Sequence, residues 1–222
     1  MNELRILREC EKIVMATSFV SSKFYAFSLL ESNELYIGNF ENDNVLKFDS
    51  ENSHSVSLHY LPKSDLLLSI LKDCSVVLYH TDKLPHLPVI GKLQAVRTSE
   101  YVGLVQSFLI KGKEYIVTAM EYFILKIWHL IKGKMRLFRV IRTGGLIRSL
   151  VYLENSEMIA VLYQSGKLAF FGVFSGKLER EISVKAGCVE NMFLMKDKNM
   201  IGVMNPWISE IEFVQLQGKE GG

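Results

Sequence analysis

Residues 125–134 have the sequence LKIWHLIKGK, in which an aromatic residue is followed five positions later by a glycine–lysine pair. The same arrangement returns in LAFFGVFSGK (168–177) and in IEFVQLQGK (211–219). The aromatic residues Trp128, Phe171 and Phe213 are separated by 43 and 42 residues. A nearly constant spacing of this size indicates an internal repeat, in which every unit folds into the same small supersecondary structure.

The segments around these aromatic residues repeat as well. Before each of them, apolar runs alternate with short polar stretches, namely KGKE (111–114), LENSE (153–157) and KDKN (196–199). After the first two glycine–lysine pairs a further alternating segment follows, MRLFRVI (135–141) and LEREISV (178–184). A period of two is typical of half-buried strands, and glycine suits a hairpin turn that requires positive φ. Each unit is therefore predicted to hold four antiparallel strands.

Two further units precede Trp128, with Tyr79 and Phe40 in the aromatic position. The last unit shows only three strands, while the segment NELRILREC (2–10) is a strand without a unit. One missing strand and one spare strand predict an all-β propeller of five four-stranded blades closed by the N-terminal strand, which leaves no open sheet edge. The whole chain, residues 1–222, then forms a single domain. Part of a larger propeller is the other arrangement that fits.

An irregular first unit is an alternative interpretation. The stretch SNELYIGNFENDNVLKFDSEN (32–52) also resembles the second and third strands of a unit, with Phe48 in the aromatic position. Phe48 and Tyr79 are only 31 residues apart, however, which is short for repeats of about 40–45 residues. The spacing favours five regular units.

The pattern of four strands with an aromatic residue near the end of the third resembles the WD40-repeat propeller family. LKIWHL (125–130) places Trp128 where that family carries a Trp-Asp pair, and LKFDS (46–50) holds Phe48 and Asp49. His129 stands in place of the usual aspartate, and no Gly-His dipeptide precedes a unit. The resemblance covers nearly the whole chain as a pattern. It implies a platform for other proteins rather than a catalyst.

Composition narrows the class of protein further. Hydrophobic residues make up 49% of the 222 residues and the formal net charge is +2, so electrostatics favour neither nucleic acid nor a membrane surface. No apolar run reaches the roughly 18–20 residues that span a bilayer, and the N-terminus lacks the pattern of a signal peptide. Three widely spaced cysteines favour a reducing compartment, and we expect a cytoplasmic or nuclear protein.

Motifs for catalysis, cofactors and metals are missing from the sequence. There is no phosphate-binding loop, no dinucleotide fingerprint and no nucleophile elbow. The histidines do not pair with cysteine at a zinc-like spacing, so we expect them at the surface or in packing: they are His54, His59, His80, His86 and His129. We therefore expect no enzyme, no cofactor and no metal site.

A carbohydrate-binding or glycoside-hydrolase-like propeller is the alternative function. Glycoside hydrolases use a pair of carboxylates, which a propeller would place on the inner strands around its channel. On the predicted inner strands only Glu190 supplies a carboxylate. The missing second acid argues against catalysis by a pair of carboxylates.

One stretch of the sequence is strongly basic. No acidic residue lies between Glu121 and Glu154, and the predicted outer strand of the third unit carries the candidate partner-binding residues Lys132, Lys134, Arg136, Arg139 and Arg142. These cations either solvate the strand and keep its edge from pairing, or bind an acidic protein segment or a nucleic-acid backbone. Arg148 lies just beyond, after the predicted crossover TGG (143–145).

A second candidate is Trp207 in the predicted turn NPWIS (205–209). A tryptophan in a loop serves either as an interface anchor or as a plug folded back over its own unit. Together these patterns predict an interaction scaffold that binds other proteins with acidic segments. The chain could equally act as one part of a larger complex.

Overall fold

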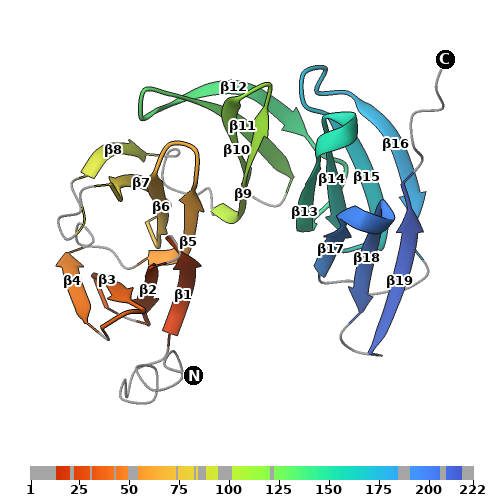
Figure 1. Cartoon of the computed structure of the whole chain (residues 1–222). Helices are drawn as coiled ribbons and strands as arrows, with labels where there is room; N and C mark the ends of the chain where they lie inside the picture. Colours follow the sequence, from red (N-terminus) through yellow and green to blue (C-terminus); the bar gives the residue numbers. More distant parts are fainter. Residues whose placement is uncertain are drawn as a thin grey trace. The chain divides into compact units, whose positions relative to one another are not determined.

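The computed structural model describes residues 14–20, 23–30, 32–42, 44–49, 55–73, 75–82, 84, 89–94, 102–120, 123–184, 191–205 and 209–216. Over these residues the chain is all-β, and its strands form five sheets in which they follow one another in chain order (Figure 1). Two short 3₁₀ turns, η1 (Glu154–Ser156) and η2 (Lys196–Lys198), complete the ordered elements.

The strands of each sheet are as follows. Sheet 1 contains β1 (Val14–Phe19), β2 (Phe24–Leu29), β3 (Glu34–Asn39) and β4 (Val45–Asp49). Sheet 2 contains β5 (Ser55–Leu61), β6 (Leu66–Leu71), β7 (Ser75–His80) and β8 (Val89–Gln94). Sheet 3 contains β9 (Val102–Ile110), β10 (Lys113–Met120), β11 (Ile124–Ile131) and β12 (Lys134–Arg142). Sheet 4 contains β13 (Ile147–Leu153), β14 (Met158–Tyr163), β15 (Lys167–Gly172) and β16 (Leu178–Ser183). Sheet 5 contains β17 (Asn191–Met195), β18 (Met200–Asn205) and β19 (Glu210–Gln215).

The five units predicted from the sequence are thus five sheets. Phe48 lies on β4, the fourth strand of sheet 1, where it pairs with Leu35 of β3, so the irregular first unit is wrong. Sheet 5 has three strands among the described residues, as its sequence predicts. The segment 2–10, expected to supply the fourth strand, lies outside the described residues.

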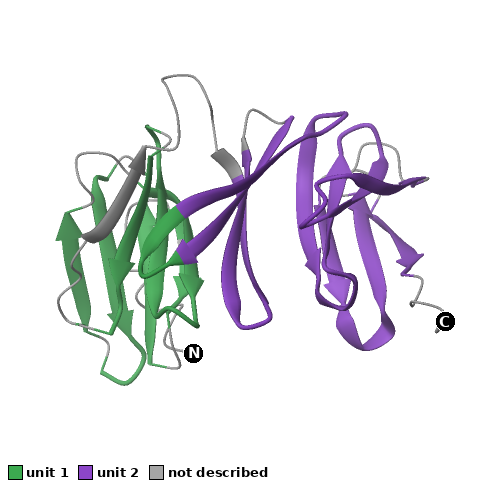
Figure 2. Cartoon of the chain, turned by 90° about the horizontal axis from the view of Figure 1, so that it is seen from above, with its two compact units in different colours: residues 1–101, 131–135 green, residues 102–130, 136–222 purple. Residues whose placement is uncertain are grey.

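The chain divides into two compact units (Figure 2). Unit 1 comprises Met1–Tyr101 with Ile131–Met135, and unit 2 comprises Val102–Leu130 with Arg136–Gly222. Sheets 1 and 2 belong to unit 1, and sheets 3 to 5 belong to unit 2 except for the residues at the turn between β11 and β12. The single domain over residues 1–222 stays a prediction.

Within each unit, the first strands of successive sheets lie side by side. In unit 1, β1 lies beside β5; in unit 2, β13 lies beside both β9 and β17. At each of these junctions a polar side chain on one first strand accepts a hydrogen bond from a backbone N–H on the next. These bonds run from Tyr60 N to Ser18 Oγ (3.1 Å), from Tyr152 N to Gln106 Oε1 (2.9 Å) and from Met192 N to Ser149 Oγ (3.3 Å).

Apolar side chains fill the space between neighbouring sheets. In unit 1, Leu67 and Tyr79 belong to a buried cluster that joins sheets 1 and 2. In unit 2, a larger cluster runs through sheets 3, 4 and 5 and includes Ile127, Phe171 and Ile201. The aromatic position of the repeat therefore lies in the core at Tyr79, Trp128 and Phe171, although Phe213 in the last sheet is 49% exposed.

The first hairpins of three sheets share one backbone conformation. Each loop ends on a non-glycine residue in the left-handed region, with φ of 54° at Asp65, 51° at Glu157 and 51° at Asn199. The carbonyl of that residue accepts a hydrogen bond from the first backbone N–H after the third strand of its sheet. The donors are Thr81 (3.0 Å), Val173 (3.1 Å) and Leu216 (2.9 Å). The repeat seen in the sequence therefore extends to individual hydrogen bonds.

Glu157 is the least suited of these three residues to its backbone conformation, because aspartate and asparagine enter the left-handed region more readily. We expect Glu157→Asn to raise the free energy of unfolding by about 0.5–1 kcal/mol, measured by urea denaturation. The reciprocal change, Asn199→Glu, should lower it. An unchanged or reduced stability of the Glu157 variant would contradict the shared-loop interpretation.

The glycine–lysine pairs form turns, as predicted. Gly133 has φ of 71° between β11 and β12, and Gly176 has φ of 66° between β15 and β16. Gly218 lies outside the described residues. The sequence IKGK occurs at 110–113 as well as at 131–134, and in both places the lysine–glycine pair has positive φ at both residues. Two consecutive residues with positive φ form the tight turn that suits two-residue hairpins.

Candidate functional site

The basic residues predicted to bind a partner lie on or beside β12, the last strand of sheet 3. Lys132 is exposed in the turn before the strand, and Lys134, Arg136 and Arg142 are exposed on the strand itself. Because side chains alternate along a strand, Lys134, Arg136 and Arg142 share one side of β12. The structure thus brings three of these candidate residues onto one side of an outer strand and places Lys132 in the turn that precedes it.

Arg139 is the exception, because it contacts the neighbouring sheet. Its Nη1 donates a hydrogen bond to the carbonyl of Ser175, at 3.3 Å, in the turn after β15. Its guanidinium also lies 5.7 Å from the centre of the Phe138 ring. Arg139 is half-buried and joins sheet 3 to sheet 4, so a role in partner binding stays a prediction.

Exposed apolar side chains on β12 form a feature that the sequence analysis missed. Leu137 is 52% exposed, Phe138 is 38% exposed and Val140 is 47% exposed. Phe138 and Val140 lie between Arg136 and Arg142 on one side of the strand. The alternation of MRLFRVI was visible in the sequence, but only the structure shows that these apolar residues are left uncovered.

Aromatic rings extend this surface toward sheet 4. Phe138 makes edge contacts with Tyr115 at 5.5 Å and with Phe174 at 5.9 Å between ring centres. Phe174 is 41% exposed and follows β15. We call Lys132, Lys134, Arg136, Phe138 and Phe174 the β12 surface. Cations next to half-exposed rings are typical of protein-binding surfaces.

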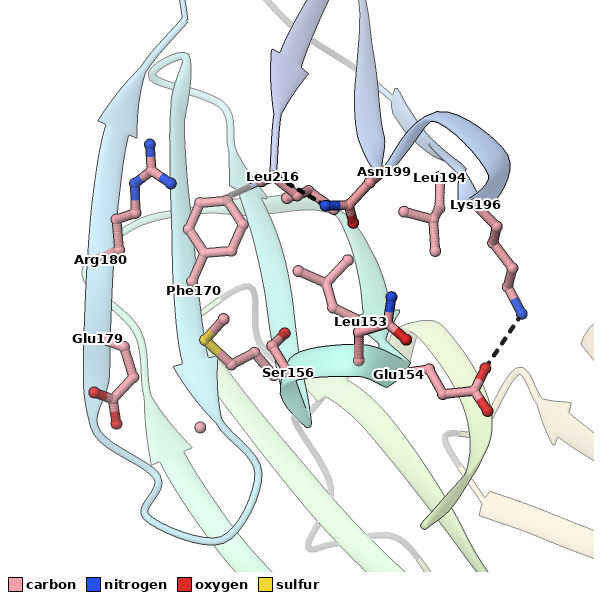
Figure 3. A pocket seen from close by; sticks show the side chains of 13 residues that line it. Leu153, Glu154, Ser156, Phe170, Glu179, Arg180, Leu194, Lys196, Asn199 and Leu216 are labelled. Atoms are coloured by element: carbon pink, nitrogen blue, oxygen red, sulfur yellow. Dashed lines mark hydrogen bonds and ion pairs between the residues drawn. The ribbon is translucent and has the colours of Figure 1, made fainter. Parts of the chain in front are cut away.

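A pocket of about 720 Å³ lies between sheets 4 and 5, next to the 3₁₀ turns η1 and η2 (Figure 3). Its apolar wall is formed by side chains from both sheets, namely Leu153, Met158, Phe170, Leu194 and Leu216. Phe170 is almost fully buried, and it stands on β15 opposite Arg180 of β16. A volume of this size is sufficient for a small ligand or a short peptide segment.

Charged side chains surround the opening of the pocket. Lys196 of η2 pairs with Glu154 of η1, with 3.6 Å between Nζ and Oε2. Glu179 accepts a hydrogen bond from Ser175 Oγ at 3.1 Å. The Arg180 guanidinium lies 5.8 Å from the centre of the Phe170 ring, and among the described residues it has no carboxylate partner. One cation at the opening is therefore left without a counter-charge.

The described histidines serve packing or local polar contacts. Burial lowers the pKa of His59 to about 4, and its Nε2 lies 2.8 Å from Ser57 Oγ. His129 stacks on Tyr115 with ring centres 4.8 Å apart, and His80 Nδ1 lies 3.2 Å from Asp82. Among the described residues, no three histidine, cysteine or acidic side chains gather into a possible metal site.

Several predicted residues lie outside the described part of the chain. These are Trp207, His54, His86 and Glu190. The interface anchor at Trp207 and the carbohydrate alternative that depended on Glu190 both stay predictions. In the part of the chain that the structure describes, no helix has the length and apolar character needed to cross a membrane.

Comparison of the sequence with protein-family models and with curated proteins finds no match.

Proposed function

We propose that the five sheets are the blades of a WD40-like propeller. The first strands of neighbouring sheets lie side by side within each unit, as the inner strands of blades do around a propeller axis. On this proposal residues 2–10 add a fourth strand to sheet 5 beside β19, or the sheets belong to a larger ring. An experimental structure in which β19 pairs neither with residues 2–10 nor with a strand of another chain would contradict this proposal.

We propose further that the protein is a non-catalytic scaffold of the cytoplasm or nucleus, and that it binds an acidic segment of another protein along β12. The observation that carries this proposal is the row of exposed cations and exposed apolar side chains on one side of a single outer strand. In an extended segment with acidic residues at positions i and i+2 and an apolar residue at i+4, all three side chains point to one side, in an order that matches Lys134, Arg136 and Phe138. Its carboxylates would pair with Lys134 and Arg136 while its apolar residues cover Phe138.

The charges on β12 have a second possible effect, because lysine and arginine on an outer strand prevent unwanted pairing between sheets. Protection of the edge requires only positive charge, whereas partner binding also requires the apolar side chains between the charges. Loss of the apolar contact therefore separates the two effects. Phe138→Ser removes the apolar contact and leaves every charge in place.

The binding test uses a fluorescent peptide with the sequence Glu-Ser-Glu-Ser-Val-Ser-Val, which places its acidic and apolar side chains on one side, and its binding is followed by anisotropy at low and moderate salt. Lys132→Glu, Lys134→Glu and Arg136→Glu combined should weaken binding by at least about tenfold, because each exposed charge pair contributes roughly 0.5–1 kcal/mol. Phe138→Ser should weaken it by several fold at either salt concentration, since apolar contact is not screened.

The chain provides a matched control for the charge reversal. Residues 110–113 repeat the sequence IKGK of residues 131–134, and Lys111 and Lys113 are exposed in the same kind of turn. Lys111→Glu with Lys113→Glu should leave binding within about twofold of the wild type. Equal losses in the two sets of variants would show that net charge alone attracts the peptide, and the proposed site on β12 would be abandoned.

A further inference from the structure

The pocket between sheets 4 and 5 is separate from the β12 surface. Its wall comes from residues far apart in the sequence, since Phe170 lies on β15 while Leu194 and Leu216 belong to sheet 5. The wall is apolar, whereas the opening is lined by the charged side chains of Glu154, Glu179, Arg180 and Lys196 (Figure 3). An occupant must therefore be apolar on one side and charged at its outer end.

The distribution of charge indicates the sign of that outer end. Glu154 and Lys196 neutralise each other, and Glu179 is bound by Ser175. Among the described residues, Arg180 contacts the ring of Phe170 and no carboxylate, and Figure 3 shows its guanidinium pointing away from the Glu179 carboxylate. An arginine fixed on an aromatic face retains all its hydrogen-bond donors for a carboxylate. The complementary group is thus an acid.

We propose that this pocket binds an extended segment of a partner protein in which an apolar residue is followed two positions later by an aspartate or glutamate. Side chains two positions apart in an extended chain point the same way and lie about 6.6 Å from each other. This spacing is close to the 5.8 Å between the Phe170 ring centre and the Arg180 guanidinium carbon. The apolar side chain contacts the half-buried Met158, Leu194 and Leu216 of the pocket wall. The carboxylate accepts hydrogen bonds from Arg180.

This inference deepens the proposed scaffold function, since it assumes a protein partner, but it uses a surface separate from β12. The two can therefore fail independently. Arg180 is not part of the β12 surface, and none of the β12 residues lines the pocket. A change at Arg180 can weaken peptide binding when the charge reversal at Lys132, Lys134 and Arg136 leaves it unchanged. This result would support the pocket and contradict the β12 surface.

The test uses three synthetic peptides and the full chain with isotope-labelled methionine methyl groups, because Met158 lines the pocket. The first peptide is Ac-Gly-Leu-Ser-Asp-Gly-NH2, the second replaces aspartate by asparagine, and the third, Ac-Gly-Leu, ends in a free carboxylate. We expect the first to shift the Met158 signal in a saturable way and the second to bind about tenfold more weakly, since a hydrogen bond to a charged group contributes about 1.5–3 kcal/mol.

Variants of the protein complete the test. Arg180→Gln should weaken the first peptide about tenfold and remove its advantage over the second. Arg148→Gln changes an exposed arginine on β13 of the same sheet and should leave binding unchanged. Ser156→Trp fills the opening and should abolish the shift in a protein whose circular dichroism is that of the wild type. Equal binding of the aspartate and asparagine peptides, or binding of the free carboxylate alone, would overturn the proposal.

Discussion

Replacement of Phe171 by alanine is expected to lower the free energy of unfolding by about 3–5 kcal/mol, whereas the same change at Phe213 should cost less than about 1 kcal/mol. The two residues occupy the same position in the repeat, on β15 and β19. Phe171 is 4% exposed within the core of unit 2, and Phe213 is 49% exposed. The difference in cost follows from burial alone, because the deleted atoms are identical.

The two tryptophans of the chain make this comparison simple to measure. Trp128 is buried on β11, and Trp207 lies between β18 and β19 in the sequence, so both belong to unit 2. Urea denaturation followed by tryptophan fluorescence therefore reports on the unit that holds both phenylalanines. If Phe213→Ala is as destabilising as Phe171→Ala, then Phe213 is covered in solution by a further strand or a further sheet.

A large cost at Phe213 would have a specific meaning for the proposed propeller. Phe213 of β19 pairs with Gly202 of β18. The ring of Phe193 on β17 lies over that glycine, and an added Cβ at Gly202 would come within 2.4 Å of the ring. Phe193, Phe213 and Ile211 leave one face of sheet 5 apolar and exposed. A ring that closes on itself covers this face, so the same pair of variants distinguishes a closed arrangement from an open one.

The sequence was sufficient to predict the strands because their signals are local. Alternation in MRLFRVI and positive φ at Gly133 depend only on residues close in the chain, and both are found where they were expected. The residue in the left-handed conformation at the end of three loops could also have been predicted from the sequence, since LPKSD (61–65), LENSE (153–157) and MKDKN (195–199) align in the repeat. The polar side chain at the end of each is the common signal.

The candidate sites depend on contacts between sheets, which the sequence does not reveal. The strand pattern predicts that Arg139 and Arg136 lie on opposite sides of β12, but not that Arg139 reaches Ser175 at the end of sheet 4. The pocket near Phe170 exists only because side chains from sheets 4 and 5 leave space between them. No spacing of residues along the chain encodes that space.

Acidification is expected to destabilise unit 1 through His59, by about 2–3 kcal/mol between pH 7 and pH 4.5. Burial lowers the pKa of His59 in the folded chain to about 4, while the unfolded chain binds this proton near the ordinary value of 6.5. Between these two pH values the unfolded state holds more protons than the folded state. Stability is therefore complete above pH 6.5 and falls as the pH decreases toward 4.

Thermal unfolding followed by far-UV circular dichroism at several pH values measures this loss, since unit 1 contains no tryptophan. His59→Gln should flatten the profile between pH 6.5 and 4.5, because glutamine does not titrate in this range.

Glu34→Gln is the control. Hydrogen bonds from Lys47 and Tyr36 lower the pKa of Glu34 to about 2, so the stability that Glu34 contributes is lost only below about pH 4.5. A wild-type profile that is flat above pH 4.5, or a His59 variant that retains the full slope, would show that His59 is solvated in the folded chain.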